Sequence, residues 1–264
     1  EMTTKDLAIV DDTASRFCWY VEKVIEVSQL NPREINYQLE IIKPLLEWVL
    51  PGYQIPDTSG NSEPRKGTAR RHDRSGYALK AGAAPDLLIT KDFEYRNVPA
   101  KKAAKIYAAV EVKEQASREM LGRELTENGS AYSYVLHLIW ELATYLCVTR
   151  RVILTNCRRW QFFDREKNPD MDVLRLKQYL SAWNLTDGID SAGTGEIVRQ
   201  LVAGCEAATI DVLPNRGSLK KEEYETSGEP DEWIRDLLEI PALVRTDSPE
   251  SWDRLISYIR EFIL

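Results

Sequence analysis

Hydrophobic residues in the first fifty positions recur every three or four residues, as they do on the buried face of an amphipathic helix. The pattern predicts a first helix over residues 11–30, with Asp12 as its N-cap. A second helix is predicted to begin at Asn31-Pro32 and to end at Pro51-Gly52. Pro44 lies inside it and predicts a kink or a break, because proline has no N–H to donate. The apolar stripe of this second helix is Ile35, Leu39, Ile42, Leu46 and Val49.

The middle of the chain changes to short apolar runs that are typical of strands. Single strands are predicted at residues 87–90 and 106–112, and a hairpin at residues 151–156 and 159–163. Helices are predicted near residues 130–147, 170–182, 195–207, 230–240 and 248–263. The segment 58–84 is rich in Gly, Ser and Pro and predicts a long loop, and 209–229 is the best linker candidate.

Strands that alternate with helices favour an α/β protein with a mixed central sheet flanked by helices. A chain of 264 residues can bury a substantial core. We expect residues 1–180 to form that core. Residues 181–264 are expected to form an acidic, mainly helical C-terminal extension, packed on the core or following it.

Membrane insertion and secretion are not indicated by the composition. No apolar stretch approaches the roughly 20 residues of a membrane span, and the first residues lack the basic and then apolar pattern of a secretion signal. The four cysteines lie far apart, which favours reduced thiols over a disulfide framework or a zinc site. We therefore expect a cytoplasmic protein, or a nuclear one if the source is a eukaryote.

The net charge of −7 is unevenly distributed along the chain. Residues 180–264 contain 8 Lys and Arg against 17 Asp and Glu, a net −9, so residues 1–179 carry +2. A mildly basic body of this kind is compatible with a polyanionic partner. The predicted loop adds a basic cluster that suits either a solvated loop or a surface contacting nucleic-acid phosphates: Arg65, Lys66, Arg70, Arg71, Arg74 and Lys80.

Candidate chemistry lies on the second predicted strand, in the segment AAVEVKE. Side chains alternate along a strand, so Glu111 and Lys113 are expected to point to one side and Val112 to the other. Among the lysines of the chain, Lys113 alone has an acidic residue two positions before it. Pro85-Asp86 opens the preceding strand, so Asp86 can lie beside Glu111 and form a pocket with two carboxylates. Phosphodiester hydrolysis by Mg²⁺ uses such a pocket, with a lysine beside the metal.

The combination of PDLLIT with a later AAVEVK resembles the PD-(D/E)xK nuclease superfamily, and most closely the N-terminal nuclease domain of type I restriction enzyme motor subunits. Two further features are similar over residues 30–165. Glu34 precedes Pro44 by ten residues in a predicted helix, and the strand Ile153-Leu154-Thr155-Asn156 is followed by Trp160 and a further strand. The resemblance implies a restriction-endonuclease-like sheet and a Mg²⁺-dependent endonuclease that hydrolyses DNA, with Mn²⁺ able to replace Mg²⁺.

The resemblance also implies a role for each matching residue. Asp86 and Glu111 would bind the metal, and the backbone carbonyl of Val112 would complete the ligand set. Lys113 would position the attacking water, and Glu34 would reach the metal through water. The basic cluster would bind nucleic acid.

The chain departs from these relatives at several positions. Their arginine three or four residues after the helix glutamate is replaced by Tyr37 or Gln38, and the glycine after Leu-Thr-Asn is Cys157. The glutamine of their Gln-x-x-x-Tyr motif has no clear counterpart, the nearest polar residues being His137 and Glu141. A histidine at such a helical position is typical of a hydrogen-bonded core residue.

Two other functions stay open at this point. A nuclease-like fold can lose catalysis and serve as a nucleic-acid-binding or protein-assembly module, although this chain retains both acidic residues and the lysine. An all-helical interaction protein is the third hypothesis, and the strand-like segments count against it. A homodimer, or a partner protein that selects the target, would be compatible with the nuclease hypothesis.

Overall fold

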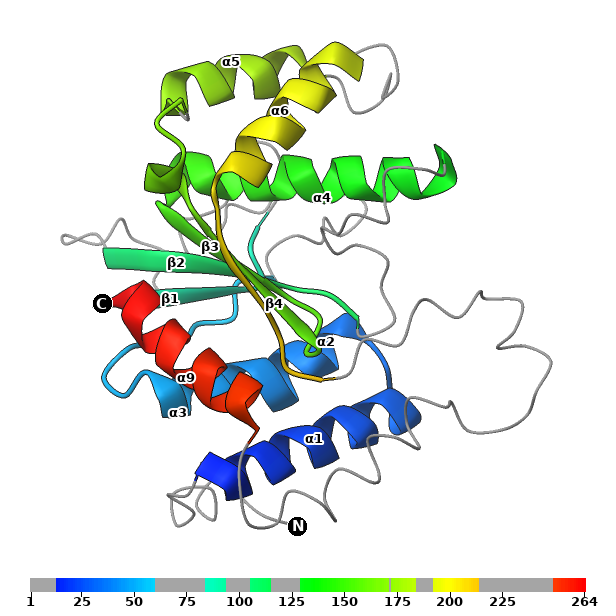
Figure 1. Cartoon of the computed structure of the whole chain (residues 1–264), viewed down its shortest axis with the longest axis vertical. Coiled ribbons are helices and arrows are strands. Elements are labelled where there is room, and N and C mark those ends of the chain that lie inside the picture. Colours follow the sequence, from blue (N-terminus) through cyan, green and yellow to red (C-terminus); the bar gives the residue numbers. More distant parts are fainter. Residues whose placement is uncertain are drawn as a thin grey trace, which may run out of the picture.

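A five-stranded mixed sheet between two layers of helices forms the centre of the protein (Figure 1). The computed structural model describes residues 13–59, 84–93, 105–114, 129–170, 172–183, 192–213 and 249–264. The strands are β1 (Leu87–Lys91), β2 (Lys105–Val112), β3 (Arg151–Thr155), β4 (Arg159–Asp164) and β5 (Glu206–Asp211). The longer helices are α1 (Thr13–Leu30), α4 (Gly129–Val148), α5 (Val173–Ala182), α6 (Ala192–Gly204) and α9 (Glu250–Ile263).

The strands lie in the order β1-β2-β3-β4-β5. Three neighbouring pairs are antiparallel, and β2 and β3 are parallel. Parallel neighbours need a crossover connection, and α4 lies between these two strands in the chain. This connection places α4 across the face of the sheet where β2 ends.

Each face of the sheet has its own hydrophobic core. Alternate strand residues such as Val110 and Ile153 pack with side chains of α1, α3 (Lys43–Val49) and α9. Their neighbours Ala109 and Leu154 pack with α4, α5 and α6 on the opposite face. Figure 1 shows these two helical groups on either side of the strands. The predicted mixed sheet flanked by helices is therefore confirmed.

Most of the predicted elements are also present. Helices were expected at the positions of α1, α4, α5, α6 and α9, and strands at the positions of β1, β2, β3 and β4. The predicted turn of the hairpin is confirmed as well, with the Asn156 side chain accepting from the backbone N–H groups of Arg158 and Arg159. Asp12 and the expected helix 230–240 lie outside the described residues.

The predicted stripe of the second helix was wrong in its first half. Ile35 and Leu39 are 37% and 40% exposed, whereas Tyr37, Gln38 and Ile41 are buried. The chain forms α2 (Glu34–Tyr37), then a π-helical turn over Gln38–Ile42, and then α3. A π turn contains an extra residue, so it rotates one end of the apolar face relative to the other. Pro44 follows this turn in the first positions of α3, and because the chain before it is already helical, its missing N–H interrupts the helical hydrogen bonds at this point.

Strand β5 was missed by the sequence pattern, which placed a helix to residue 207 and a linker from 209. Residues 206–211 instead pair antiparallel with β4. Their burial does not alternate, since Ala207, Ala208 and Thr209 are all half-buried. Alanine has little intrinsic preference for strands, so pairing with β4 determines the structure here.

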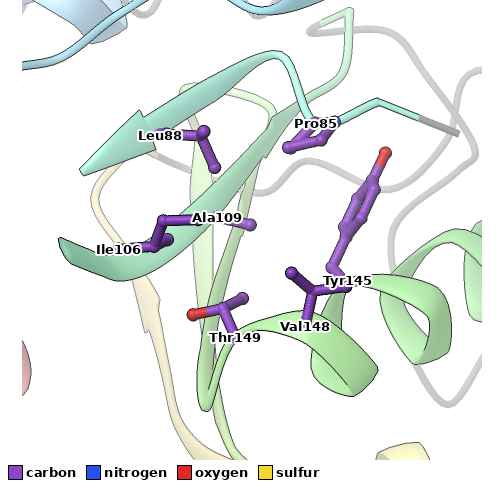
Figure 2. A pocket seen from close by; sticks show the side chains of 7 residues that line it. All are labelled: Pro85, Leu88, Ile106, Ala109, Tyr145, Val148 and Thr149. Atoms are coloured by element: carbon purple, nitrogen blue, oxygen red, sulfur yellow. The ribbon is translucent and has the colours of Figure 1, made fainter. Parts of the chain in front are cut away.

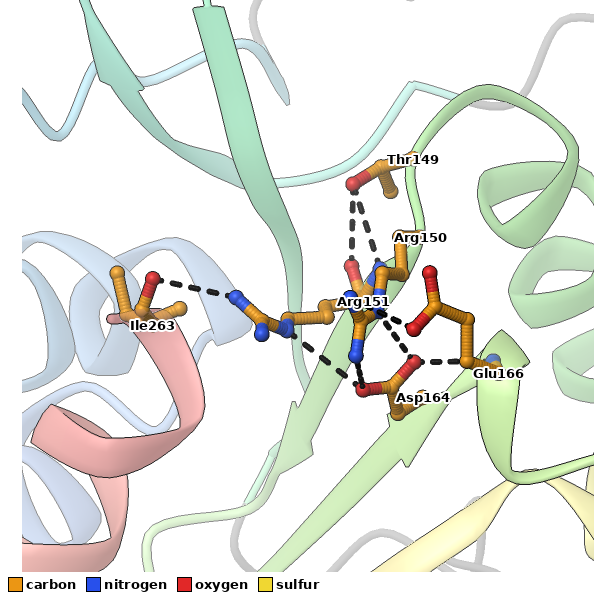
Figure 3. A network of polar contacts seen from close by, with 6 residues as sticks. All are labelled: Thr149, Arg150, Arg151, Asp164, Glu166 and Ile263. Atoms are coloured by element: carbon orange, nitrogen blue, oxygen red, sulfur yellow. Dashed lines mark hydrogen bonds and ion pairs between the residues drawn. The ribbon is translucent and has the colours of Figure 1, made fainter.

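The last helix is fixed to the sheet by a polar network at the start of β3 (Figure 3). Arg150 forms two hydrogen bonds with Asp164, at 2.8 and 2.7 Å. Arg151 donates to the carbonyl of Ile263 in α9, and Trp252 of α9 is fully buried against Phe17 and Tyr20 of α1. Residues after 180 thus supply both a strand and a core helix. The expected division at residue 180 stays a prediction.

In the part of the chain that the structure describes, no helix has both the length and the apolar character needed to cross a membrane.

Candidate metal and catalytic site

Strand pairing brings the predicted acidic residues together at one end of the sheet. Leu87 lies opposite Val110 in the antiparallel pair β1–β2, which places Asp86 beside Glu111. Glu111 and Lys113 follow Ala109 in the alternation and face the α4 layer, whereas Val110 and Val112 pack in the other core. The predicted common orientation of Glu111 and Lys113 is confirmed.

Three carboxylates converge at this point. Glu34 of α2, Asp86 and Glu111 each offer an oxygen that lies within 4.8 Å of the other two. Asp86 also accepts a hydrogen bond from the backbone N–H of Val112, at 2.8 Å. Lys113 Nζ lies 2.7 Å from Glu111 Oε1. The structure therefore gathers four predicted site residues into one cluster.

Burial makes this cluster electrostatically costly. Asp86, Glu111 and Lys113 are only 7%, 3% and 5% exposed. Loss of hydration and the nearby charges of Glu111 and Glu34 raise the pKa of Asp86 well above its usual range. Loss of hydration also raises the pKa of Glu111 to about 7, even though Lys113 favours its ionised form. Buried carboxylates that face one another are stabilised when a cation lies between them.

Helix α4 adds two side chains that sequence reasoning did not assign to the site. Tyr145 donates a hydrogen bond to Glu111 Oε2 at 2.8 Å, and Glu141 Oε2 lies 3.3 Å from Lys113 Nζ. Glu141 precedes Tyr145 by four residues, which is the spacing of the expected Gln-x-x-x-Tyr motif with glutamate in place of glutamine. That spacing was the signal in the sequence that could have identified both residues.

Lys113 is held as a cation between two carboxylates. Burial alone would lower its pKa, but the charges of Glu111 and Glu141 raise it above its usual range. Burial would likewise raise the pKa of Glu141, which hydrogen bonds from His137 and Lys113 lower instead. At neutral pH Lys113 is therefore a fixed positive charge and cannot accept a proton.

His137 does not belong to the core, so the expectation of a core histidine was wrong. Its side chain is 53% exposed, and its Nε2 lies 3.3 Å from Glu141 Oε1. It precedes Glu141 by one helical turn, and its ring is stacked on Trp140.

Gln38 supports the site from the π-helical turn. Its Nε2 donates to the backbone carbonyl of Asp86 at 3.0 Å and to Asp57 Oδ1 at 2.8 Å. The backbone N–H of Thr58 donates to the same Asp86 carbonyl. Through these hydrogen bonds Gln38 and Thr58 fix the backbone of Asp86 at the start of β1.

An apolar cavity of about 20 Å³ adjoins the cluster (Figure 2). The ring of Tyr145 projects from α4 along this cavity toward Pro85 (Figure 2). The apolar neighbours of Tyr145 lower the local dielectric, which strengthens its buried hydrogen bond with Glu111. The cavity is lined by Pro85, Leu88, Ile106, Ala109, Tyr145, Val148 and Thr149.

Two parts of the predicted site are not addressed by this geometry. The structure ties Val112 to Asp86 through its N–H, and metal ligation by its carbonyl stays a prediction. The predicted nucleic-acid-binding residues lie outside the described residues: Arg65, Lys66, Arg70, Arg71, Arg74 and Lys80.

Comparisons of the chain with models of protein families, with curated proteins and with solved structures found no match.

Proposed function

We propose that this protein is a Mg²⁺-dependent endonuclease of the PD-(D/E)xK type that hydrolyses phosphodiester bonds in DNA. The observation that carries the proposal is the meeting of Glu34, Asp86 and Glu111 within 4.8 Å, with a buried lysine against one of them. Two buried carboxylates and a buried ammonium beside a third, partly buried carboxylate are uncommon in a protein without a function.

The donor set fits Mg²⁺ or Mn²⁺. Both prefer oxygen ligands, and bonds of roughly 2.1 Å keep neighbouring ligand oxygens roughly 3 to 4 Å apart. Asp86 and Glu111 would hold the ion directly, and the less buried Glu34 would reach it through water. A divalent cation bound there would polarise the phosphate and favour ionisation of a water molecule.

The remaining side chains have separate tasks. Lys113 stays protonated, so it would donate hydrogen bonds to the attacking water and to the phosphate and would offset the developing negative charge. Tyr145 donates a hydrogen bond to one oxygen of Glu111 and thereby fixes the orientation of that carboxylate. Gln38 keeps Asp86 at the start of β1. Each task follows from a contact in the cluster.

The arrangement of the strands supports a restriction-endonuclease-like fold. The two strands that carry the acidic residues are adjacent and antiparallel, and α4 connects β2 to the parallel strand β3. In this proposal the basic cluster Arg65–Lys80 contacts the DNA backbone, and a second copy or a partner protein supplies target selection.

A cleavage assay tests the proposal. Purified protein should cut plasmid DNA with Mg²⁺ or Mn²⁺ and should stop when EDTA is added. Lys113→Met and Asp86→Asn should each abolish cleavage while thermal unfolding stays cooperative. Glu196→Gln is the matched control, because Glu196 forms an exposed ion pair with Arg199 on α6, outside the cluster.

The alternative is a nuclease-like module that binds nucleic acid or a protein partner without cutting. Wild-type protein that binds DNA but leaves single-stranded DNA, duplex DNA and RNA intact would favour this alternative. Cleavage of RNA alone would support phosphodiester hydrolysis at this site but would show that the substrate is RNA and not DNA. Cleavage that survives in both variants would refute the assignment of the site.

A further inference from the structure

One face of α4 presents a row of three polar side chains to the site. His137, Glu141 and Tyr145 follow one another at intervals of four residues, so they share a face of the helix. Tyr145 and Glu141 contact Glu111 and Lys113 respectively. The helix therefore engages Glu111 and Lys113 at once.

Glu141 differs from the other carboxylates in its position. The group that could hold a metal ion, among the described residues, is Glu34, Asp86 and Glu111. Glu141 is not in this group and contacts Lys113 from the side of the helix. Its second oxygen is turned toward His137, on the outer side of the same row.

The need for a second carboxylate follows from charge. In the proposed function Glu111 would bind a divalent cation, and its carboxylate would then offer less negative charge to Lys113. The Lys113 ammonium would also be repelled by that cation directly. A carboxylate that does not bind the metal would keep Lys113 in place under these conditions.

We propose that Glu141 is the positioning residue that holds the Lys113 ammonium at the metal-bound site. This inference rests on the proposed nuclease function and adds to it a positioning role for helix α4. His137 contacts the other oxygen of Glu141 and so helps to orient this carboxylate. Tyr145 orients the carboxylate of Glu111 through its hydrogen bond.

The test compares Glu141→Met with Glu141→Gln. Methionine keeps the length and helix preference of the side chain but removes both carboxylate oxygens, and glutamine keeps one acceptor. Glu196→Met is the matched control.

For Glu141→Met we expect kcat for DNA cleavage to fall about 10- to 100-fold, as for supporting residues around metal sites. The KM for DNA and the Mg²⁺ concentration for half-maximal rate should stay within about twofold of wild type. Glu141→Gln should recover part of the lost kcat.

A second measurement separates this inference from the function on which it rests. The ¹⁵N resonance of the Lys113 ammonium, assigned with Lys113→Arg, should be visible in the wild-type protein with Mg²⁺ and should broaden or vanish in Glu141→Met. The wild-type protein could be inactive and still show this resonance, and Glu141→Met could lose it. That result would refute the proposed nuclease function and would support the positioning role of Glu141.

Two results would overturn the role of Glu141. One is an active wild-type protein with unchanged kcat and an unchanged ammonium resonance in Glu141→Met. The other is a raised Mg²⁺ requirement with unchanged kcat at saturating Mg²⁺, which would make Glu141 a metal ligand.

Discussion

The pKa of Glu111 predicts how the stability of the metal-free protein depends on pH. Burial raises this pKa from 4.5 to about 7 in the folded state. The folded protein therefore binds more protons than the unfolded chain between these pH values. The free energy of unfolding should consequently fall as pH rises through this interval, because deprotonation of Glu111 is easier in the unfolded chain.

The size of the effect follows from the same shift. A difference of one pKa unit corresponds to about 1.4 kcal/mol, so the change from 4.5 to about 7 corresponds to a loss of about 3 kcal/mol between pH 4.5 and pH 7. Asp86 should add a loss of the same sign, because its pKa is also raised. Bound Mg²⁺ should oppose the loss by favouring the ionised carboxylates of the folded state. At a hundred times its Kd the ion would contribute about 2.7 kcal/mol.

Urea unfolding followed by tryptophan fluorescence measures this dependence. Wild type, Glu111→Gln and the control Glu40→Gln would be compared at pH 5 and pH 8 in EDTA, and then with Mg²⁺. The quantity of interest is the change with pH within each protein, because Glu111→Gln also removes the ion pair with Lys113 and so alters absolute stability. Glu40 is exposed on the π-helical turn and should behave like wild type.

The wild-type loss should be larger than that of Glu111→Gln by about 3 kcal/mol, and Mg²⁺ should reduce it. Equal pH dependence in wild type and Glu111→Gln would refute the reasoning, since it would mean that Glu111 ionises as easily in the folded protein as in the unfolded chain. A loss that Mg²⁺ does not change would refute cation binding at the carboxylates.

Three further substitutions test the parts of the fold that position the site. Tyr20→Phe removes a buried hydroxyl that donates to the Cys157 carbonyl and accepts from Trp160 Nε1. Urea unfolding should show that the free energy of unfolding falls by about 1–3 kcal/mol. An unchanged free energy of unfolding would contradict these contacts. Trp252→Ala should cost about 3–5 kcal/mol by the same measurement, because the fully buried ring joins α9 to α1; a smaller loss would indicate that α9 is peripheral. Asp164→Asn should lower the thermal unfolding midpoint by weakening the contacts with two neighbouring arginines, and an unchanged midpoint would show that this network does not hold the start of β3.

Cys157 illustrates how a residue other than glycine is accommodated in a tight turn. It has a φ of +67° in the hairpin turn, where glycine is least strained. The thiol is fully buried, and the carbonyl of the same residue accepts from Tyr20. The structure shows burial and a hydrogen bond that offset the backbone strain.

The sequence by itself determined the local features of this protein. Helical spacing identified α1, α4 and α9, and the alternation of strand residues placed Glu111 and Lys113 on one side. The pairing of Asp86 with Glu111 was also accessible, because neighbouring strands in the chain are commonly neighbours in the sheet. These properties depend on periodicity over a few residues, which the order of amino acids fixes directly.

Tertiary structure alone decided which distant side chains complete the cluster. Glu34 meets Asp86 because the π-helical turn and α3 fix how α2 lies against the sheet, and Glu141 reaches Lys113 because the parallel step from β2 to β3 carries α4 over the site. Strand β5 exists because β4 offers an edge to pair with. Distances between elements depend on how the two cores pack, and packing joins residues far apart in the chain that no local pattern connects.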